Sequence, residues 1–110
     1  MEINFTYSYD EEWGEIILSA TVGKAQFEIG LSEVIDEDDQ FTGTFHLFSL
    51  ENLGEKGSGL GRLVLKALKT WATEQGGTAI TTTPGGEYLY QMYSDVGFSP
   101  MEDGRWLASL

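Results

Sequence analysis

The sequence predicts an α+β (mixed α/β) fold, in which two helices pack on one central, mostly antiparallel sheet of about six or seven strands. Two observations predict it. Four segments with the pattern of strands come first, and an amphipathic helix then stands between the fourth of them and a fifth strand. A length of 110 residues is typical of one domain, so we expect residues 1–110 to form a single unit.

The first half of the chain has the pattern of four antiparallel strands. Apolar and polar residues alternate with the period of two that is typical of a half-buried strand. The short link Gly23-Lys24 joins the second and third segments and predicts a hairpin. The fourth segment alternates Phe45, Leu47 and Ser49 on one face with His46, Phe48 and Leu50 on the other. The four segments are residues 3–9, 15–22, 25–34 and 42–50.

A helix and a strand follow, and together with the fourth strand they predict a right-handed parallel crossover. The apolar residues of this helix recur with the spacing of a helix that packs on a sheet. They are Leu60, Leu63, Val64, Ala67, Leu68, Trp71 and Ala72. Gly76-Gly77 ends the helix, and residues 78–83 form a β-branched strand. A shorter helix at 87–96 and a hairpin of 98–101 with 105–110 complete the chain.

Composition excludes several classes of function. The chain has no cysteine, so disulfides, thiolate catalysis and cysteine-ligated metals are excluded. The acidic run at 36–39 lacks the ligand spacing of a calcium loop, and we expect a solvated turn and no metal. No apolar run reaches membrane-spanning length and the N-terminus lacks a basic signal-peptide start, so we expect a soluble cytoplasmic protein. The net charge of −12 disfavours nucleic acid and anionic membranes and favours basic partners.

The stretch Lys56-Gly57-Ser58-Gly59-Leu60-Gly61-Arg62 predicts an anion site, because it places backbone N–H groups at the start of a helix. We expect Lys56 and Arg62 to contact the anion. Lys66 and Lys69 fit either that role or ordinary solvation. A Walker loop needs Gly-Lys-Ser/Thr, and a dinucleotide fingerprint needs G-x-G-x-x-G. The stretch matches neither nucleotide loop.

The glycine stretch resembles the (Arg/Gln)-x-x-Gly-x-(Gly/Ala) signature of the GCN5-related N-acetyltransferases, the GNAT family. Lys56 departs from the usual arginine or glutamine. A second segment, Tyr93-Ser94-Asp95-Val96-Gly97-Phe98, is similar to the Tyr-x-x-x-Gly-Phe end of that family's C-terminal helix. The resemblance covers roughly residues 42–110 and implies a GNAT-like acyl-CoA acyltransferase fold. It also implies that the glycine loop holds the pyrophosphate of acetyl-coenzyme A (acetyl-CoA).

The resemblance further implies how acetyl transfer to an amine would proceed. The fourth and fifth strands would separate, and the backbone of Phe48, Ser49 and Leu50 would hold the pantetheine. Tyr93 would protonate the departing thiolate; the alternative is that Tyr93 is only a buried core residue with its hydroxyl bonded. Glu51, His46 and water remain open as the base, and His46 is more simply a strand residue. The implied coenzyme-binding residues are Phe48, Ser49, Leu50, Lys56, Gly57, Ser58, Gly59, Leu60, Gly61 and Arg62.

The acceptor side departs from the family, because residues 10–14 leave no room for helices between the first two strands. Of the 18 carboxylates, 13 precede Lys56, so we expect an open acidic site for a protein lysine or a polyamine, with carboxylates 36–39 contributing. Compact acetyltransferases of this kind occur among phage proteins, including anti-CRISPR enzymes that acetylate a host effector, and this chain resembles them by analogy. The alternative is a non-catalytic acidic protein of this fold, for example a phage-encoded inhibitor, that blocks a basic host protein or mimics nucleic acid. A homodimer is left open.

Overall fold

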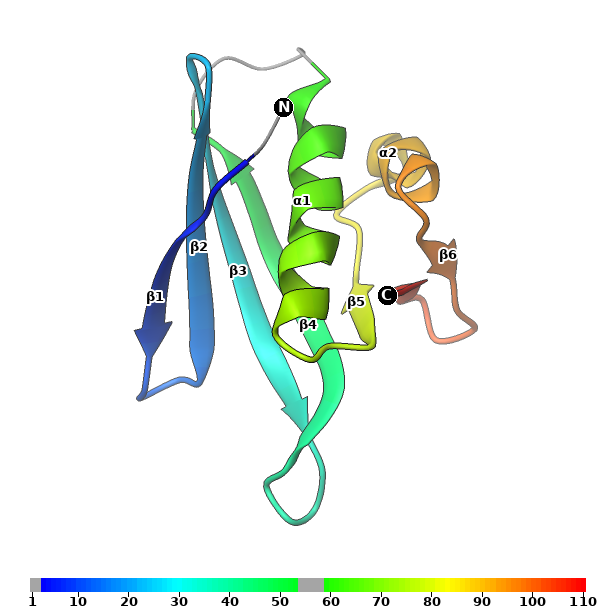
Figure 1. Cartoon of the computed structure of the whole chain (residues 1–110). Helices are drawn as coiled ribbons and strands as arrows, with labels where there is room; N and C mark the ends of the chain where they lie inside the picture. The colour runs from blue at the N-terminus through cyan, green and yellow to red at the C-terminus, as the bar shows by residue number, and fades with distance from the viewer. Residues whose placement is uncertain (1–2, 54–58) are drawn as a thin grey trace.

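The computed structural model describes residues 3–53 and 59–110 of the chain, which form a seven-stranded sheet with two helices (Figure 1). The strand order is β1-β2-β3-β4-β5-β7-β6, and only β4 and β5 pair in parallel. This α+β, mostly antiparallel sheet confirms the predicted fold class. The strands are β1 (Thr6–Asp10), β2 (Glu15–Val22), β3 (Ala25–Ile35), β4 (Phe41–Asn52), β5 (Ala79–Thr82), β6 (Ser99–Pro100) and β7 (Trp106–Ser109).

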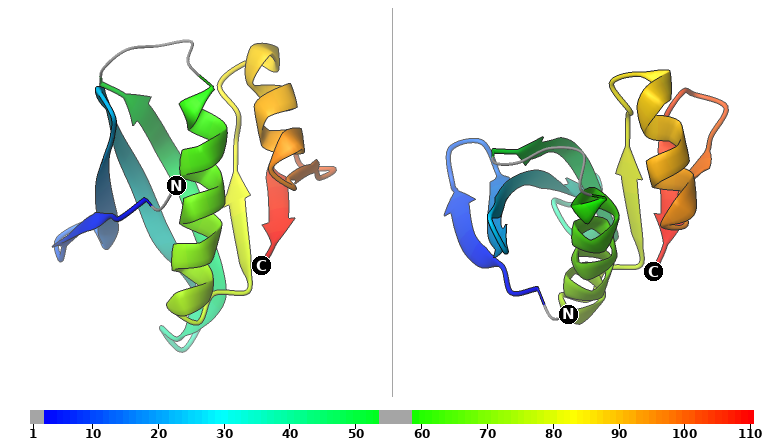
Figure 2. Two further views of the ribbon diagram at one scale, coloured as in Figure 1. Left: turned by 45° about the horizontal axis from the view of Figure 1, so that its top comes forward. Right: turned by 90° about the horizontal axis from the view of Figure 1, so that it is seen from above.

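Both helices cover the same face of the sheet (Figure 2). Helix α1 (Leu60–Glu74) connects β4 to β5, which makes the predicted crossover. Helix α2 (Tyr90–Asp95) lies over β5 and β7, where Tyr90 contacts Trp106 with ring centroids 5.0 Å apart. The predicted helix at 87–96 is divided, because a 3-10 turn, η1 (Glu87–Leu89), precedes α2. The opposite face of the sheet has no helix among the described residues.

The buried face of α1 differs from the predicted stripe by about one position. Leu65 is fully buried together with Val64, Leu68 and Ala72, whereas Leu63 is 40% exposed. The reason is that α1 packs against α2 as well as against the sheet. Sequence periodicity detects a single packing surface, and the second one depends on where α2 lies.

The N-terminal strand begins later than predicted, at Thr6 instead of Ile3. Ile3 and Phe5 pack against the core before the strand begins. Tyr7 and Tyr9 extend past the core and are half-exposed, and Tyr7 stacks on Trp71 of α1 with ring centroids 6.5 Å apart. A turn at residues 11–14 leads directly to β2, so no helix stands between the first two strands, as the sequence predicted.

Strands β4 and β5 stay together for only part of their length. Their pairing covers Thr44–Leu47 of β4 and Ala79–Thr82 of β5, while β4 continues to Asn52. Beyond Leu47 the described part of β4 therefore has a strand partner only on the β3 side. This separation opens the sheet at the carboxyl ends of its parallel pair. No helix of the described residues is long and apolar enough to cross a membrane.

Candidate functional site

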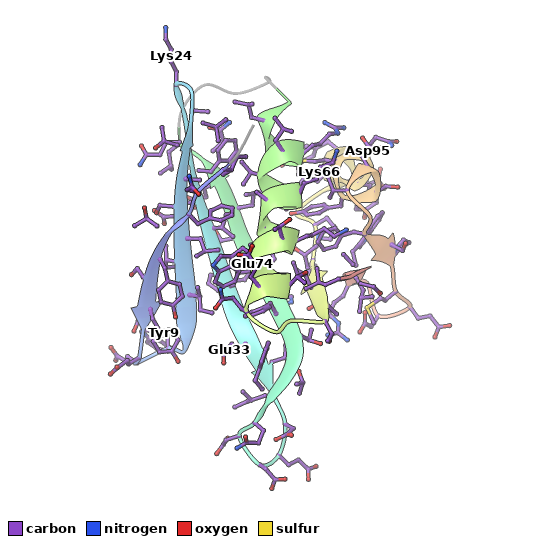
Figure 3. The ribbon with its side chains drawn as sticks, viewed as in Figure 1. Tyr9, Lys24, Glu33, Lys66, Glu74 and Asp95 are labelled. Atoms are coloured by element: carbon purple, nitrogen blue, oxygen red, sulfur yellow. The ribbon has the colours of Figure 1, made fainter. Side chains whose placement is uncertain are left out.

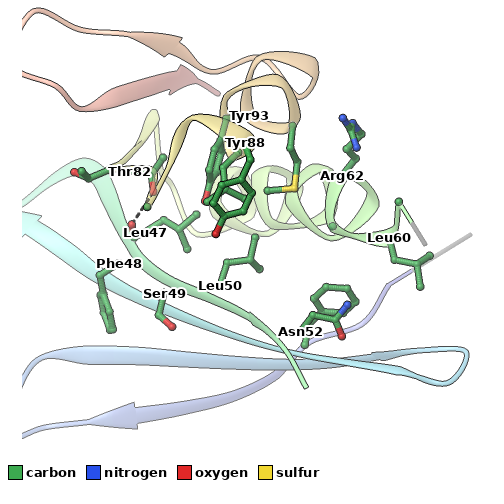
Figure 4. A pocket seen from close by; sticks show the side chains of 17 residues that line it. Leu47, Phe48, Ser49, Leu50, Asn52, Leu60, Arg62, Thr82, Tyr88 and Tyr93 are labelled. Carbon is green, nitrogen blue, oxygen red and sulfur yellow. Dashed lines mark hydrogen bonds between the residues drawn. The ribbon is translucent and has the colours of Figure 1, made fainter. Parts of the chain in front are cut away.

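A pocket of about 620 Å³ lies where β4 and β5 separate (Figure 4). Open sheets with parallel strands bind ligands at this place, outside the carboxyl ends of the strands. Five segments contribute: β3, the end of β4, the start of α1, the end of β5 with the loop after it, and the η1–α2 segment. The lining residues are Phe27, Leu47, Phe48, Ser49, Leu50, Asn52, Gly59, Leu60, Gly61, Arg62, Thr82, Thr83, Gly85, Tyr88, Leu89, Met92 and Tyr93.

The structure brings together most of the residues that the sequence assigned to the site. Those that line the pocket are Phe48, Ser49, Leu50, Gly59, Leu60, Gly61, Arg62 and Tyr93. The predicted contacts of Lys56, Gly57 and Ser58 lie outside the described residues. Glu51 does not line the pocket.

The N-terminus of α1 forms one end of the pocket. Gly59 precedes the helix with φ of 74°, a left-handed conformation that glycine adopts without strain. Within residues 3–53 and 59–110 no side chain caps this end, and no acidic residue stands in the first turn. The first backbone N–H groups lie at the positive end of the helix dipole, which is the physical basis of an anion site.

Gly61 allows the two helices to approach each other at this end of the pocket. A Cβ atom on Gly61 would lie 3.0 Å from Sδ of Met92 on α2, which is tighter than an ordinary contact. Glycine at this position therefore serves helix packing. The alternating glycines have two separate causes here, a left-handed backbone at Gly59 and a close approach at Gly61.

A β-bulge shapes the β4 side of the pocket. Gly30 of β3 pairs with Ser49, whereas Leu31 pairs with Leu47, so Phe48 has no partner on β3. The bulge resets the alternation of side chains. Leu47 and Leu50 point toward the helices, while Phe48 and Ser49 point away (Figure 4). The predicted assignment of Ser49 and Leu50 to faces is therefore wrong, because an extra residue in the strand reverses the pattern.

The Phe48 ring lies on the helix-free face of the sheet, directly over Gly30. A Cβ atom on Gly30 would lie 2.4 Å from Cε2 of Phe48, so only glycine leaves room for this ring. Phe48 also lines the pocket on the other side of the strand and is 45% exposed. One residue thus contacts both the pocket and the helix-free face.

Tyr93 lies on the α2 side of the pocket and is only 5% exposed. Its ring packs edge-on against Phe98, with centroids 5.3 Å apart, which explains the Tyr-x-x-x-Gly-Phe spacing as a packing unit. Burial raises the pKa of the Tyr93 phenol above its ordinary value of 10.0, and a hydrogen bond with the Thr82 hydroxyl acts in the opposite direction. At neutral pH the phenol keeps its proton and can donate it.

Thr82 links Tyr93 to the strand on the opposite side of the pocket. Its Oγ1 donates a buried hydrogen bond of 2.9 Å to the backbone carbonyl of Leu47. This contact joins the last paired residues of β4 and β5, at the point where the strands begin to separate. The Tyr93 hydroxyl is therefore positioned relative to the β4 backbone.

Arg62 lines the pocket and also connects the two helices. Its Nε donates to Oδ2 of Asp95 at 2.8 Å, and both side chains are about 40% exposed. Hydrogen bonds from Gln91 and Arg62 lower the pKa of Asp95, so the carboxylate stays ionised. Lys66 stands on the same side of α1, close enough to Asp95 to lower that pKa further (Figure 3).

Lys69 has a structural role. Its Nζ donates a 2.9 Å hydrogen bond to the backbone carbonyl of Val96, which follows the last residue of α2. A cation at this end of a helix satisfies a terminal carbonyl and complements the dipole. The sequence left two interpretations open for Lys69, contact with the anion or ordinary solvation. The observed contact with Val96 is neither of them.

The two candidate bases on β4 point to the helix-free face. Glu51 is exposed and stands opposite Glu28 of β3. His46 is half-buried, and its Nδ1 lies 2.9 Å from Oγ1 of Thr81. Burial, followed by the charge of Arg105, lowers the pKa of His46 below 6.5, so the ring is neutral at pH 7. Across the described ranges, no cluster of His, Asp and Glu could hold a metal ion.

Sequence reasoning missed the η1 and α2 residues that close the pocket. Tyr88, Leu89 and Met92 all line it, and the Tyr88 side chain is 83% exposed beside the opening. The short helix was predicted, but its division at Tyr90 determines which side chains point toward β4. The apolar spacing of a six-residue helix is too short to show this.

Comparisons with known proteins identify the fold. No protein-family model matches the chain, and no curated protein matches it in sequence. Solved structures do match. An acetyltransferase from Bacillus subtilis in complex with CoA superposes with a TM-score of 0.67 at 11% identity, covering 99% of this chain and 98% of that one.

Two further solved structures carry the name of the class. The GNAT domain of PAT from S. lividans matches with a TM-score of 0.62 at 18% identity over 94% of this chain. A GNAT family acetyltransferase from Brucella melitensis in complex with acetyl-CoA matches with a TM-score of 0.63 at 15% identity over 86% of this chain. This chain spans only 65% and 58% of the lengths of those two chains. The protein therefore has the fold of the GNAT acetyltransferases.

Proposed function

We propose that this protein is an N-acetyltransferase that moves the acetyl group of acetyl-CoA to an amine. The single observation that carries the proposal is the pocket, which extends from the start of α1 to the buried phenol of Tyr93 along the separated edge of β4. Its volume of about 620 Å³ lies in the range of small-molecule sites. The similar folds that hold CoA or acetyl-CoA support this assignment.

In this proposal the pocket residues bind acetyl-CoA by its two ends. The N–H groups at the start of α1 contact the pyrophosphate, and Arg62 adds charge beside them when it exchanges its contact with Asp95 for one with phosphate. The predicted contacts of Lys56, Gly57 and Ser58 complete the loop. The pantetheine lies along the bulged backbone of residues 48–50, where β4 lacks a partner on the β5 side.

The chemical step is a direct transfer. The neutral amine nitrogen attacks the thioester carbonyl, a C–N bond forms, the C–S bond breaks, and the amine releases one proton. A backbone N–H at the bulge stabilises the oxyanion, and Tyr93 donates its proton to the departing thiolate. Glu51 and His46 lie outside the pocket lining, so water is the base that best fits the geometry. Tyr93 recovers its proton from solvent after CoA leaves.

Two measurements test the proposal. Acetyl-CoA at about 100 times its dissociation constant should stabilise the fold by about 2.7 kcal/mol, which a thermal shift detects. Release of free CoA is then followed with a thiol-reactive dye, which has no background because the chain has no cysteine. If acetyl-CoA stabilises the fold but no CoA is released when a range of amines is added, an enzymatic role would be contradicted.

The alternative is a non-catalytic acidic protein that binds and blocks a basic partner. The net charge of −12 is the observation that favours it. This alternative predicts no thermal shift with acetyl-CoA and tight binding to a basic protein without acetyl transfer, so the same two measurements separate it from the enzyme.

A further inference from the structure

The helix-free face of the sheet is a broad polar surface beside the pocket. Strand pairing places its side chains in rows that cross β1 to β4. One row contains Asp10, Glu15, Ser32 and His46. The next contains Ser8, Ile17, Gly30 and Ser49, and the third contains Thr6, Ser19, Glu28 and Glu51.

This face carries four carboxylates in two cross-strand pairs, Asp10 with Glu15 and Glu28 with Glu51. Like charges that stand directly opposite each other in a sheet repel. No ion pair within residues 3–53 and 59–110 neutralises them. Lys24 stands in the β2–β3 turn beyond the strand ends (Figure 3). Arg105, whose charge acts on His46 at the edge of this face, is paired with Asp103. The face therefore has a negative potential, and a cationic partner would relieve the repulsion.

The geometry of the face relates the two carboxylate pairs to the pocket. The rows that hold them are separated by four residues along β2 and by about two strands across, so the pairs lie roughly 16 Å apart. The row between them contains Gly30, and the Phe48 ring covers that glycine. Phe48 also lines the pocket at the place where β5 no longer pairs with β4. The pocket and the acidic face therefore meet at Phe48.

We propose that this face docks the acceptor, and that the acceptor is a polypeptide segment rich in lysine and arginine. The inference rests on the proposed acetyl transfer and names its substrate. One lysine of the segment passes over the Phe48 ring, which packs against its aliphatic stem, and reaches the pocket between β4 and β5. Cations about five residues apart contact the two carboxylate pairs. A linear polyamine can neutralise the carboxylates but leaves most of the face uncovered.

The expected contribution of carboxylates 36–39 to the acceptor site is not part of this proposal, because these residues lie away from the pocket. The acidic run at 36–39 lies in the β3–β4 turn, and the extended strand between Gln40 and Leu47 places it roughly 20 Å from the pocket. Asp36 accepts hydrogen bonds from the backbone N–H groups of Asp38 and Gln40, so it stabilises its own turn. These carboxylates are far from Phe48 and serve as a matched control.

The test measures binding of a dye-labelled peptide of alternating lysine and glycine by fluorescence anisotropy, without acetyl-CoA. We expect the double variant Glu15→Gln/Glu28→Gln to weaken binding about five- to ten-fold at low salt. The control Glu37→Gln/Asp38→Asn removes the same charge from the β3–β4 turn and should change it less than two-fold. Equal effects of the two variants, or no binding, would overturn the docking face.

Acetyl transfer to the same peptide, followed by mass spectrometry, separates docking from chemistry. Peptide binding that depends on the face without acetylation would retain the docking surface and contradict the enzymatic role. Acetylation of the peptide with an unchanged KM in Glu15→Gln/Glu28→Gln would retain the enzyme and reject the docking surface. Spermidine that is acetylated in preference to the peptide would reject a polypeptide acceptor.

Discussion

The variant Tyr93→Phe is the most direct test of how the pocket works. It removes the hydroxyl that is bonded to Thr82 from a residue that is only 5% exposed, and it keeps the ring that packs on Phe98. If the phenol protonates the thiolate, turnover should fall by about 100-fold or more, the usual contribution of a general acid. The lost hydrogen bond should lower the free energy of unfolding by only about 1 kcal/mol, so the variant should fold.

The assay follows CoA release with a thiol-reactive dye, and a thermal shift measures acetyl-CoA binding separately. The matched control is Tyr88→Phe, because Tyr88 also lines the pocket but is 83% exposed. We expect Tyr88→Phe to keep turnover within about three-fold, and Tyr93→Phe to keep its acetyl-CoA affinity. Equal turnover in the wild type and Tyr93→Phe would refute the acid role and leave Tyr93 as a core residue.

Three further predictions address the loop, the sheet and the histidine. Gly59→Ala should lower the free energy of unfolding, measured in urea, by about 1 kcal/mol, because φ at Gly59 is 74°. The control Gly85→Ala should change it little, because Gly85 has open space around its Cβ position and no left-handed φ. Glu28→Gln should raise the free energy of unfolding by about 0.2–1 kcal/mol, because it removes the repulsion with Glu51; a loss of stability would show that the pair is not repulsive. Burial and a nearby arginine lower the pKa of His46, so the unfolded chain takes up a proton first as pH falls, and the free energy of unfolding should decrease below about pH 6.5. The free energies of unfolding measured in urea at pH 5.5 and pH 7.5 should differ less in His46→Gln than in the wild type. An equal difference in the two proteins would contradict the lowered pKa.

Local patterns predicted the elements that depend on neighbouring residues. The hairpin of β2 and β3 follows from two alternating segments and a Gly-Lys turn, and the observed bounds differ from the predicted ones by one residue. The start of α1 at Leu60 follows from the glycines before it. Gly59 and Tyr93, far apart in the sequence, were both assigned to one site, and both line the pocket.

The faces of β4 could not be predicted in the same way. A regular period of two places Ser49 with Leu47, but the bulge at Phe48 places Leu50 there instead. A bulge is a property of the pairing between two strands, and nothing in the β4 residues alone marks it. The position of Glu51 on the face away from the pocket follows from this reset.

Local sequence patterns predict the order of the strands and helices and an anion site at the start of α1, because alternation, amphipathic spacing and glycine act over a few residues. Which side chains meet depends on how these elements pack against one another. Leu65 is buried because α2 lies beside α1, Lys69 bonds the end of α2, and the Phe48 ring reaches the helix-free face because Gly30 lies opposite it. Gly30 and Phe48 are 18 positions apart in the sequence, and Lys69 and Val96 are 27 apart. The sequence pattern of either partner does not specify such a contact.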